Sequence, residues 1–202
     1  PFGARDWWPC KQDLNDKIDS FDIYITCPDT YIGVSNGLLQ SSTTLGGNVT
    51  RHFHHNCPIP AYLISLDVTN YAAYNIQAGL GTVASPFFPI NNYLYPESNT
   101  VSVQNAINQT VPIMNVFEEK FGLYPYRSEQ YGHVQFGWGG GMEHTTMSSM
   151  GGWSRSLIAH ELGHQWFGNK ITCGTWKDIW LNEGLTEYTA GIVVEELDGD
   201  AA

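Results

Sequence analysis

The sequence has few basic residues, no long apolar run and no paired-cysteine motif. Only 9 of its 202 residues are Lys or Arg, against 20 Asp or Glu, and the net charge is −11. A nucleic-acid partner would favour the opposite sign, so we expect none. No apolar run reaches the length of about 18 residues that a membrane-spanning helix needs, so we expect no transmembrane segment in this sequence. Most of the excess acid is interpreted as solubilising surface.

Cysteine usage leaves the redox compartment open. The sequence has four cysteines: Cys10, Cys27, Cys57 and Cys173. They form no Cys-x-x-Cys pair and so indicate no zinc ribbon, and they allow three disulfide pairings or none. Scarce Lys and abundant Asn, Ser, Thr and Tyr favour an extracytoplasmic location, and Asn48 and Asn108 lie in glycosylation acceptor triplets. Neither an initiator Met nor a signal-peptide pattern is present, so we expect an excised part of a longer protein.

The first part of the chain, residues 1–95, is predicted to be a β domain. Residues 21–27 alternate with period two, and residues 61–68 predict a further, mostly buried strand. Asn36-Gly37 is a strong hairpin signal, and residues 46–48 predict a second turn. The histidines in residues 51–55 have no carboxylate or Cys at an obvious partner spacing except Cys57. We therefore expect an exposed polar strand edge there rather than a metal site.

A shift of composition at residues 95–100 predicts a domain boundary, with a second domain over residues 96–202. A helix is expected over residues 102–121, interrupted or kinked at Pro112 and ended by Gly122. A weakly alternating strand is expected over residues 124–136. The glycine-rich residues 137–141 indicate either a close approach of the backbone to another group or a flexible turn.

Two further helices carry the polar residues of most interest. Ser154 is a suitable N-cap for a helix that we expect to run to about Phe167. A last helix is expected over residues 181–197. The aromatic residues near these helices are interpreted as packing groups: Trp166, Phe167, Trp176 and Trp180.

The first of these helices carries His160 and His164, four residues apart. Side chains at i and i+4 lie on one helix face, so both imidazoles can reach one Zn²⁺ ion. Glu161 lies about 100° further round the helix, beside the metal, where it can take a proton from a metal-bound water. Glu183 on the last helix can supply the third ligand and leave the fourth position open. A surface helix that merely carries two histidines is the plainer alternative.

Several motifs together resemble one family, the zinc gluzincin aminopeptidases typified by membrane alanyl aminopeptidase. The resemblance covers most of the chain, and its most specific parts are residues 140–144 and residues 160–188. Shorter similarities occur at residues 4–13, 35–37, 60–63 and 118–126. The implied fold is α+β: the end of an N-terminal β-sandwich or saddle domain, followed by the first part of a thermolysin-like catalytic domain, truncated on its C-terminal side.

The resemblance also implies the role of each site residue. His160, His164 and Glu183 take the ligand positions of one zinc ion per chain, and Glu161 takes the general base. Glu143 takes the carboxylate that holds the free α-ammonium of a peptide substrate. The residues before it, Gly140-Gly141-Met142, flank the substrate backbone. The implied reaction is hydrolysis of the N-terminal peptide bond through a metal-activated water.

Two departures and three alternatives accompany this resemblance. His144 stands where the family usually has Asn, and the family's oxyanion-stabilising Tyr would lie beyond Ala202, since Tyr188 is too close to Glu183. We therefore expect this stretch to bind zinc but to lack a complete active site. The alternatives are a zinc endopeptidase, an epoxide hydrolase of the same fold, and a pseudo-peptidase binding module. Glu187, one turn after Glu183, either supports a ligand histidine or is a solvated helix carboxylate.

Overall fold

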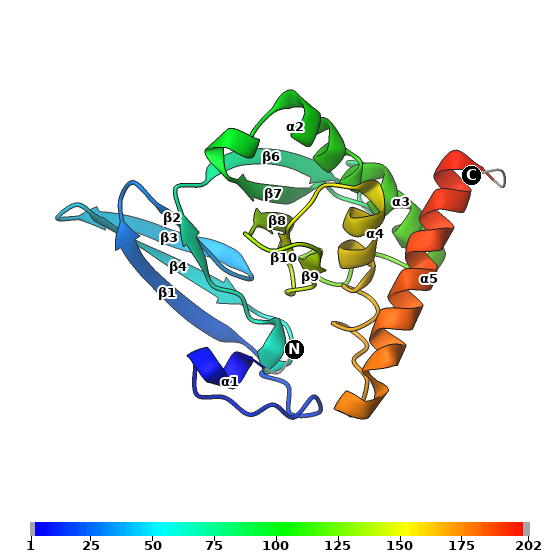
Figure 1. Cartoon of the computed structure of the whole chain (residues 1–202), viewed down its shortest axis with the longest axis horizontal. Coiled ribbons are helices and arrows are strands. Elements are labelled where there is room, and N and C mark those ends of the chain that lie inside the picture. Colours follow the sequence, from blue (N-terminus) through cyan, green and yellow to red (C-terminus); the bar gives the residue numbers. More distant parts are fainter. Residues whose placement is uncertain (1–2, 200–202) are drawn as a thin grey trace.

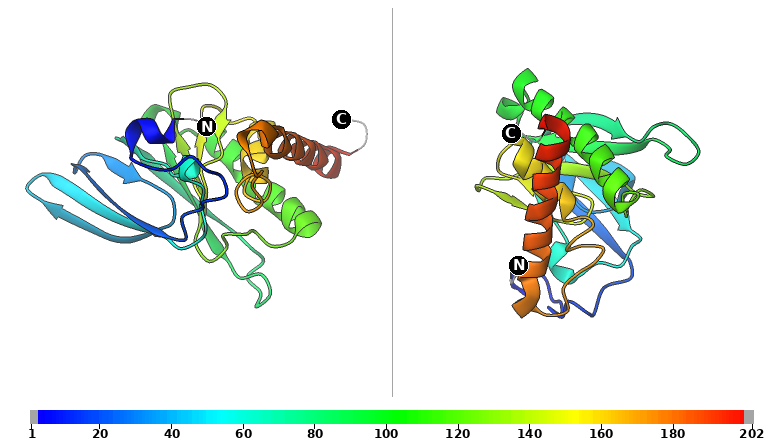
Figure 2. Two further views of the ribbon diagram at one scale, coloured as in Figure 1. Left: turned by 90° about the horizontal axis from the view of Figure 1, so that it is seen from below. Right: turned by 90° about the vertical axis from the view of Figure 1, so that its right-hand side faces the viewer.

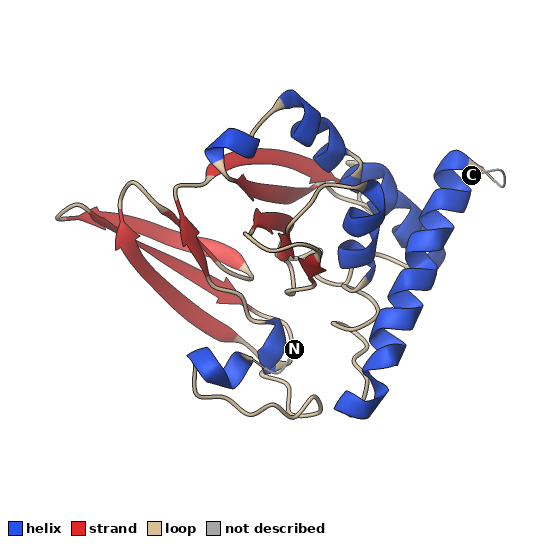
Figure 3. Cartoon of the chain, in the orientation of Figure 1, coloured by secondary structure: helices blue, strands red, loops and turns tan. Residues whose placement is uncertain are grey.

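Residues 3–199 are described by the computed structural model, and strands and helices occupy different parts of it (Figure 1, Figure 3). The strands are β1 (Phe21–Pro28), β2 (Ile32–Val34), β3 (Leu38–Leu45), β4 (Asn48–His55), β5 (Asp67–Thr69), β6 (Ala72–Ala78), β7 (Phe88–Leu94), β8 (Tyr131–Gln135), β9 (Gly141–Met142) and β10 (Ser148–Met150). The helices are α1 (Ala4–Trp7), α2 (Val101–Asn108), α3 (Thr110–Phe121), α4 (Arg155–Gly163) and α5 (Ile179–Asp198). Short 3-10 helices occur at Ala61–Leu63, Pro96–Ser98 and Trp176–Asp178. The presence of both helices and sheets confirms the prediction of a mixed α and β fold.

The N-terminal sheet has the strand order β1-β4-β3. Its β3–β4 hairpin turns at Gly46 and Gly47, which both have the positive φ that a two-residue primed turn requires. Burial alternates along β1 as the period-two pattern predicted. The expectation of a polar strand edge at residues 51–55 is wrong, because β4 is the central strand. Both His52 and His54 instead contact the Asp22 carboxylate on β1, at 2.6 and 3.1 Å.

The hairpin predicted at Asn36-Gly37 does not form. Strand β2 pairs with β5 rather than with β3, so the chain turns away at this point. Asn36 is fully buried, and its side chain donates to the carbonyl of Leu63 and accepts from the Ser65 N–H. Long-range hydrogen bonds therefore use the residue that the local turn pattern had assigned to a hairpin.

The second sheet has the order β6-β7-β8-β10-β9, with β9 at one edge. Strands β6 and β7 precede the boundary predicted between residues 95 and 96, yet they pair in one sheet with strands that follow it. Between Thr69 and Ala72 the chain passes from the two-stranded sheet of β2 and β5 into the five-stranded sheet. The composition shift at residues 95–100 marks the start of α2 and α3, which form the crossover that parallel strands β7 and β8 require.

Four predicted elements differ from the structure in type or bounds. Residues 61–63 form a 3-10 helix, not a strand, and only residues 131–135 of the strand expected over 124–136 are extended. The helix expected over 102–121 is divided at Gln109, so Pro112 lies in the first turn of α3, where its missing N–H costs least. Helix α4 ends at Gly163, earlier than expected.

Helices α3, α4 and α5 pack together against the five-stranded sheet. Figure 2 shows α5 on the outside of the helical layer, and α4 contacts both α3 and α5. Their shared core is fully buried and apolar: Ile90, Tyr131, Ile113, Phe117, Ile158, Leu162 and Val193. Trp166 packs into this core, whereas Trp180 is 64% exposed, so the packing role predicted for Trp180 is wrong. None of the helices in the described part of the chain has the length and apolarity needed to cross a membrane.

Candidate active site

Helix α4 presents two imidazoles at its C-terminal end. The Ser154 side chain accepts a hydrogen bond from the N–H of Leu157 and so caps the helix, as predicted. His160 lies in the last turn and His164 is the C-cap residue, so the two rings still come from successive turns. Their Nε2 atoms lie 3.1 Å apart.

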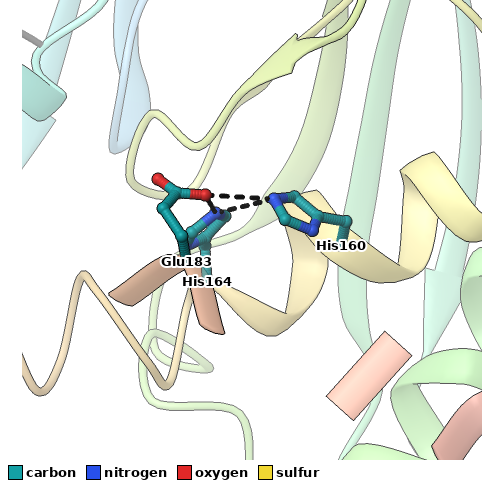
Figure 4. Close-up of side chains that lie close together, drawn as sticks. All are labelled: His160, His164 and Glu183. Carbon is teal, nitrogen blue, oxygen red and sulfur yellow. Dashed lines mark hydrogen bonds and ion pairs between the residues drawn. The ribbon is translucent and has the colours of Figure 1, made fainter. Parts of the chain in front are cut away.

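Helix α5 brings a carboxylate to the same point. The Oε2 atom of Glu183 lies 3.4 Å from the Nε2 atoms of both His160 and His164 (Figure 4). A tetrahedral Zn²⁺ with bonds of about 2.0–2.1 Å places its ligand atoms roughly 3.3–3.4 Å apart. The three observed separations agree with that geometry, and two imidazoles with one carboxylate are a donor set typical of catalytic zinc. These residues therefore fit a zinc ion.

The electrostatics of the three groups match a ligand set. Hydrogen bonds with His160 and then His164 hold the pKa of the Glu183 carboxyl well below its usual range, so it is anionic at neutral pH. The hydrogen bond to Glu183 raises the pKa of His160. A metal ion that binds here displaces the protons that the two histidines share with Glu183, so metal binding depends on pH.

Each histidine is also held on its other ring nitrogen. The Nδ1 atom of His160 lies 3.0 Å from Glu187 Oε2, and Nδ1 of His164 lies 3.1 Å from both the Phe167 carbonyl and Thr186 Oγ1. Such contacts fix the ring orientation so that Nε2 faces the metal. Of the two readings left open for Glu187, support of a ligand histidine is the one the geometry favours. Thr186 lies one helical turn after Glu183 on the buried side of α5, and no local pattern in the sequence predicted its contact with His164.

Replacing Glu187 by alanine is expected to lower zinc affinity by about 10–100-fold, because the His160 ring loses the partner that orients it. The measurement is competition with a chelator of known zinc affinity. Glu195→Ala, an exposed glutamate further along α5, is the matched control and should bind zinc as the unchanged protein does. Equal affinities in the two variants would show that Glu187 is a solvated carboxylate.

Glu161 lies on the buried side of α4, next to the predicted ligands. Its side chain is 3% exposed, and its Oε2 atom accepts no hydrogen bond from any described residue. Burial, and then the charge of Glu143, raises the pKa of the Glu161 carboxyl to about 8. A Cβ atom at Gly141 would lie 2.3 Å from Glu161 Oε1. Of the two readings of the glycine-rich segment, a close approach of the backbone is therefore the one that holds at Gly141.

Glu143 lies beside Glu161 and is 7% exposed. One carboxylate oxygen of each, together with a ring nitrogen of His164, lie within 4.8 Å of one another. The Tyr62 hydroxyl donates to Glu143 Oε1 at 3.4 Å, and the Asn169 side chain donates to the Glu143 carbonyl at 2.8 Å. Tyr62 belongs to a segment interpreted as a strand, and only its contact with Glu143 reveals its place in the site.

The predicted zinc ligands, Glu161 and Glu143 line one pocket of about 170 Å³. Its lining consists of Gly141, Met142, Glu143, His160, Glu161, His164, Ile179 and Glu183. All but one of the predicted site residues are thus brought together. Gly140 is the exception: it lies one residue outside, where its carbonyl accepts from the Gly151 N–H at 2.8 Å. His144 does not line this pocket, and its Nδ1 lies 2.9 Å from Ser149 Oγ.

Known proteins are similar to this chain in sequence. A model described as the peptidase family M1 domain matches residues 105–202. Aminopeptidase N of Oryctolagus cuniculus is 32% identical over 98% of this chain and 22% of its own length. Leucine aminopeptidase 2 of Aspergillus terreus is 30% identical over 98% of this chain and 32% of its own length. The chain thus spans between about a fifth and a third of these relatives.

Solved structures give the same result for the fold. An M1 zinc metallopeptidase from Deinococcus radiodurans superimposes with a TM-score of 0.81 at 25% identity, over 99% of this chain and 45% of that one. A mutant two-domain M1 zinc metallopeptidase bound to L-arginine gives a TM-score of 0.84 at 24% identity, with the same coverage. The family model, the sequence relatives and the solved structures agree with one another, and the chain belongs to peptidase family M1, the gluzincin aminopeptidases.

Proposed function

We propose that the protein is a zinc-dependent aminopeptidase that hydrolyses the N-terminal bond of peptides. The observation that carries the proposal is the convergence of His160, His164 and Glu183, with Glu161 and Glu143 buried beside them. The names of the relatives support the same activity. Because the chain spans only part of those relatives, the activity is proposed for the full-length protein.

Each site residue has its own role in the proposed hydrolysis. Zn²⁺ held by His160, His164 and Glu183 would polarise the scissile carbonyl and lower the pKa of a coordinated water to about 7. Glu161 takes the proton of the attacking water and returns it to the leaving amine. Its side chain is buried against Gly141, which shields the carboxylate from bulk water beside the predicted metal ligands.

Glu143 provides the anion that binds the free amino terminus and so fixes it one residue away from the bond to be cleaved. Its carboxylate is buried next to Glu161, so a substrate α-ammonium placed there forms a charge pair away from solvent. Leaving one member of such a pair unpaired is costly, which makes the site specific for a free amino terminus. The edge strand β9, from which Gly141 and Met142 come, leaves its outer backbone groups available to an extended peptide.

The Glu143→Gln variant is expected to lower kcat/KM for aminoacyl reporter substrates by about 10²-fold or more, because a buried ammonium then lacks its counter-charge. Acetylation of the substrate amine should abolish cleavage by the unchanged protein for the same reason. Both are measured with reporter substrates and the full-length protein, with Glu195→Gln as control. Cleavage of acetylated peptides at internal bonds would instead indicate an endopeptidase, and no cleavage at normal zinc content would indicate a pseudo-peptidase.

A further inference from the structure

A second and larger pocket adjoins the zinc pocket. Its volume is about 580 Å³, and it shares Gly141 and Met142 with the smaller one. The two residues belong to β9, so an extended peptide along this strand would contact both pockets. With an α-ammonium at Glu143 and a scissile carbonyl at the predicted zinc ligands, the first side chain of the peptide leaves the backbone beside the shared residues.

The walls of the larger pocket are mainly apolar and incompletely covered. Trp7 is 48% exposed, Leu66 is 46% exposed and Trp138 is 77% exposed. Large apolar groups around a concave surface are typical of a ligand site. Indole faces also attract cations, and the methylene stems of Lys and Arg pack well on such walls.

One carboxylate in this pocket has no counter-charge. Asp67 begins strand β5 and lines the pocket, and its Oδ2 atom is buried without a hydrogen-bond partner among the described residues. No Lys or Arg is among the residues that line the pocket in the described part of the chain. Burial raises the pKa of the Asp67 carboxyl to about 7, which is the response expected of a carboxylate that lacks a cationic partner.

We propose that the larger pocket receives the side chain of the first substrate residue and that Asp67 makes the enzyme prefer a basic side chain, Lys or Arg. The proposal rests on the proposed aminopeptidase function and adds a substrate class to it. In the complex, the stem of the substrate side chain packs against Trp7 and Trp138, and its cationic end pairs with Asp67. A neutral side chain of equal length fills the same space but leaves the carboxylate unpaired.

The test compares two reporter substrates that differ only in this charge, lysyl and norleucyl, on the full-length protein. We expect kcat/KM to be about 10–100-fold higher for lysyl, because a buried charge pair is gained. Asp67→Asn should bring this ratio close to one at unchanged zinc content, whereas the exposed control Asp29→Asn should keep it. A ratio near one in the unchanged protein, or an undiminished ratio in Asp67→Asn, overturns the proposal.

Two further measurements cover the remaining outcomes. If Asp67→Asn does not fold by circular dichroism, Asp67→Glu retains the charge and should shift the preference from lysyl toward the shorter ornithyl substrate; an unshifted preference overturns the proposal. If no substrate is cleaved, calorimetric binding of L-lysinamide and L-norleucinamide to the zinc-loaded protein replaces kinetics. A preference for lysinamide that Asp67→Asn removes then upholds the pocket while the aminopeptidase proposal fails. Equal binding of the two amides overturns both.

Discussion

Replacing Glu161 by glutamine is expected to lower kcat by about 10²–10⁴-fold while zinc content stays at one ion per chain. The amide has nearly the same shape, so it still fits against Gly141, where the backbone leaves no space for a Cβ atom. It cannot accept a proton from water, and the general-base step is therefore lost. Glu161 is not one of the three residues whose ligand atoms lie 3.1–3.4 Å from one another, so zinc affinity should change little.

The measurement pairs turnover of an aminoacyl reporter with zinc content determined by atomic absorption. Glu195→Gln, on the exposed part of α5, controls for the substitution itself. Near-normal turnover at full zinc content would show that Glu161 is not the base. Loss of zinc together with activity would place Glu161 among the ligands and contradict the division of roles between Glu161 and Glu183.

The part of the site that local geometry defines could be predicted from the sequence. His160 and His164 share a helix face because of their spacing alone, and Ser154 caps that helix as its residue type predicts. The position of Glu161 follows from the same periodicity. The helix ends at Gly163 rather than Phe167, yet the error does not move the histidines, since the chain continues through one further turn at His164.

The parts that depend on long-range contacts could not be predicted. Tyr62, in a 3-10 helix, contacts Glu143, the residue that follows β9. The residues next to Tyr62 in the sequence give no sign of this contact. Asn36 matches a turn signal but bonds to the backbone of Leu63 and Ser65. A related case is the boundary predicted at residue 95: strands on either side of it pair in one sheet, and composition does not reveal that pairing. Composition locates helices, whereas the membership of a strand in a sheet depends on pairing across many residues.

Removing the third ligand is expected to have an even larger effect than removing the base. In Glu183→Ala, two imidazoles from one helix remain without the anion that completes the set, and the protein should neither retain zinc at micromolar concentrations nor cleave any reporter. Added zinc should not restore activity. Glu187→Ala, by contrast, should recover activity when zinc is added in excess, because its ligands are intact.

Thermal unfolding provides a readout of the same loss that does not depend on activity. Zinc binds the folded protein, and at about 1,000 times Kd this stabilises it by roughly 4 kcal/mol. For a domain of this size, 1 kcal/mol corresponds to about 2–4 °C in Tm. A chelator should therefore lower Tm of the unchanged protein by about 8–16 °C and leave Tm of Glu183→Ala unaltered. If Tm of the unchanged protein is insensitive to chelation, or if both proteins respond equally, then helices α4 and α5 are not joined by a metal. The three side chains would then be held only by the hydrogen bonds between His160, His164 and Glu183.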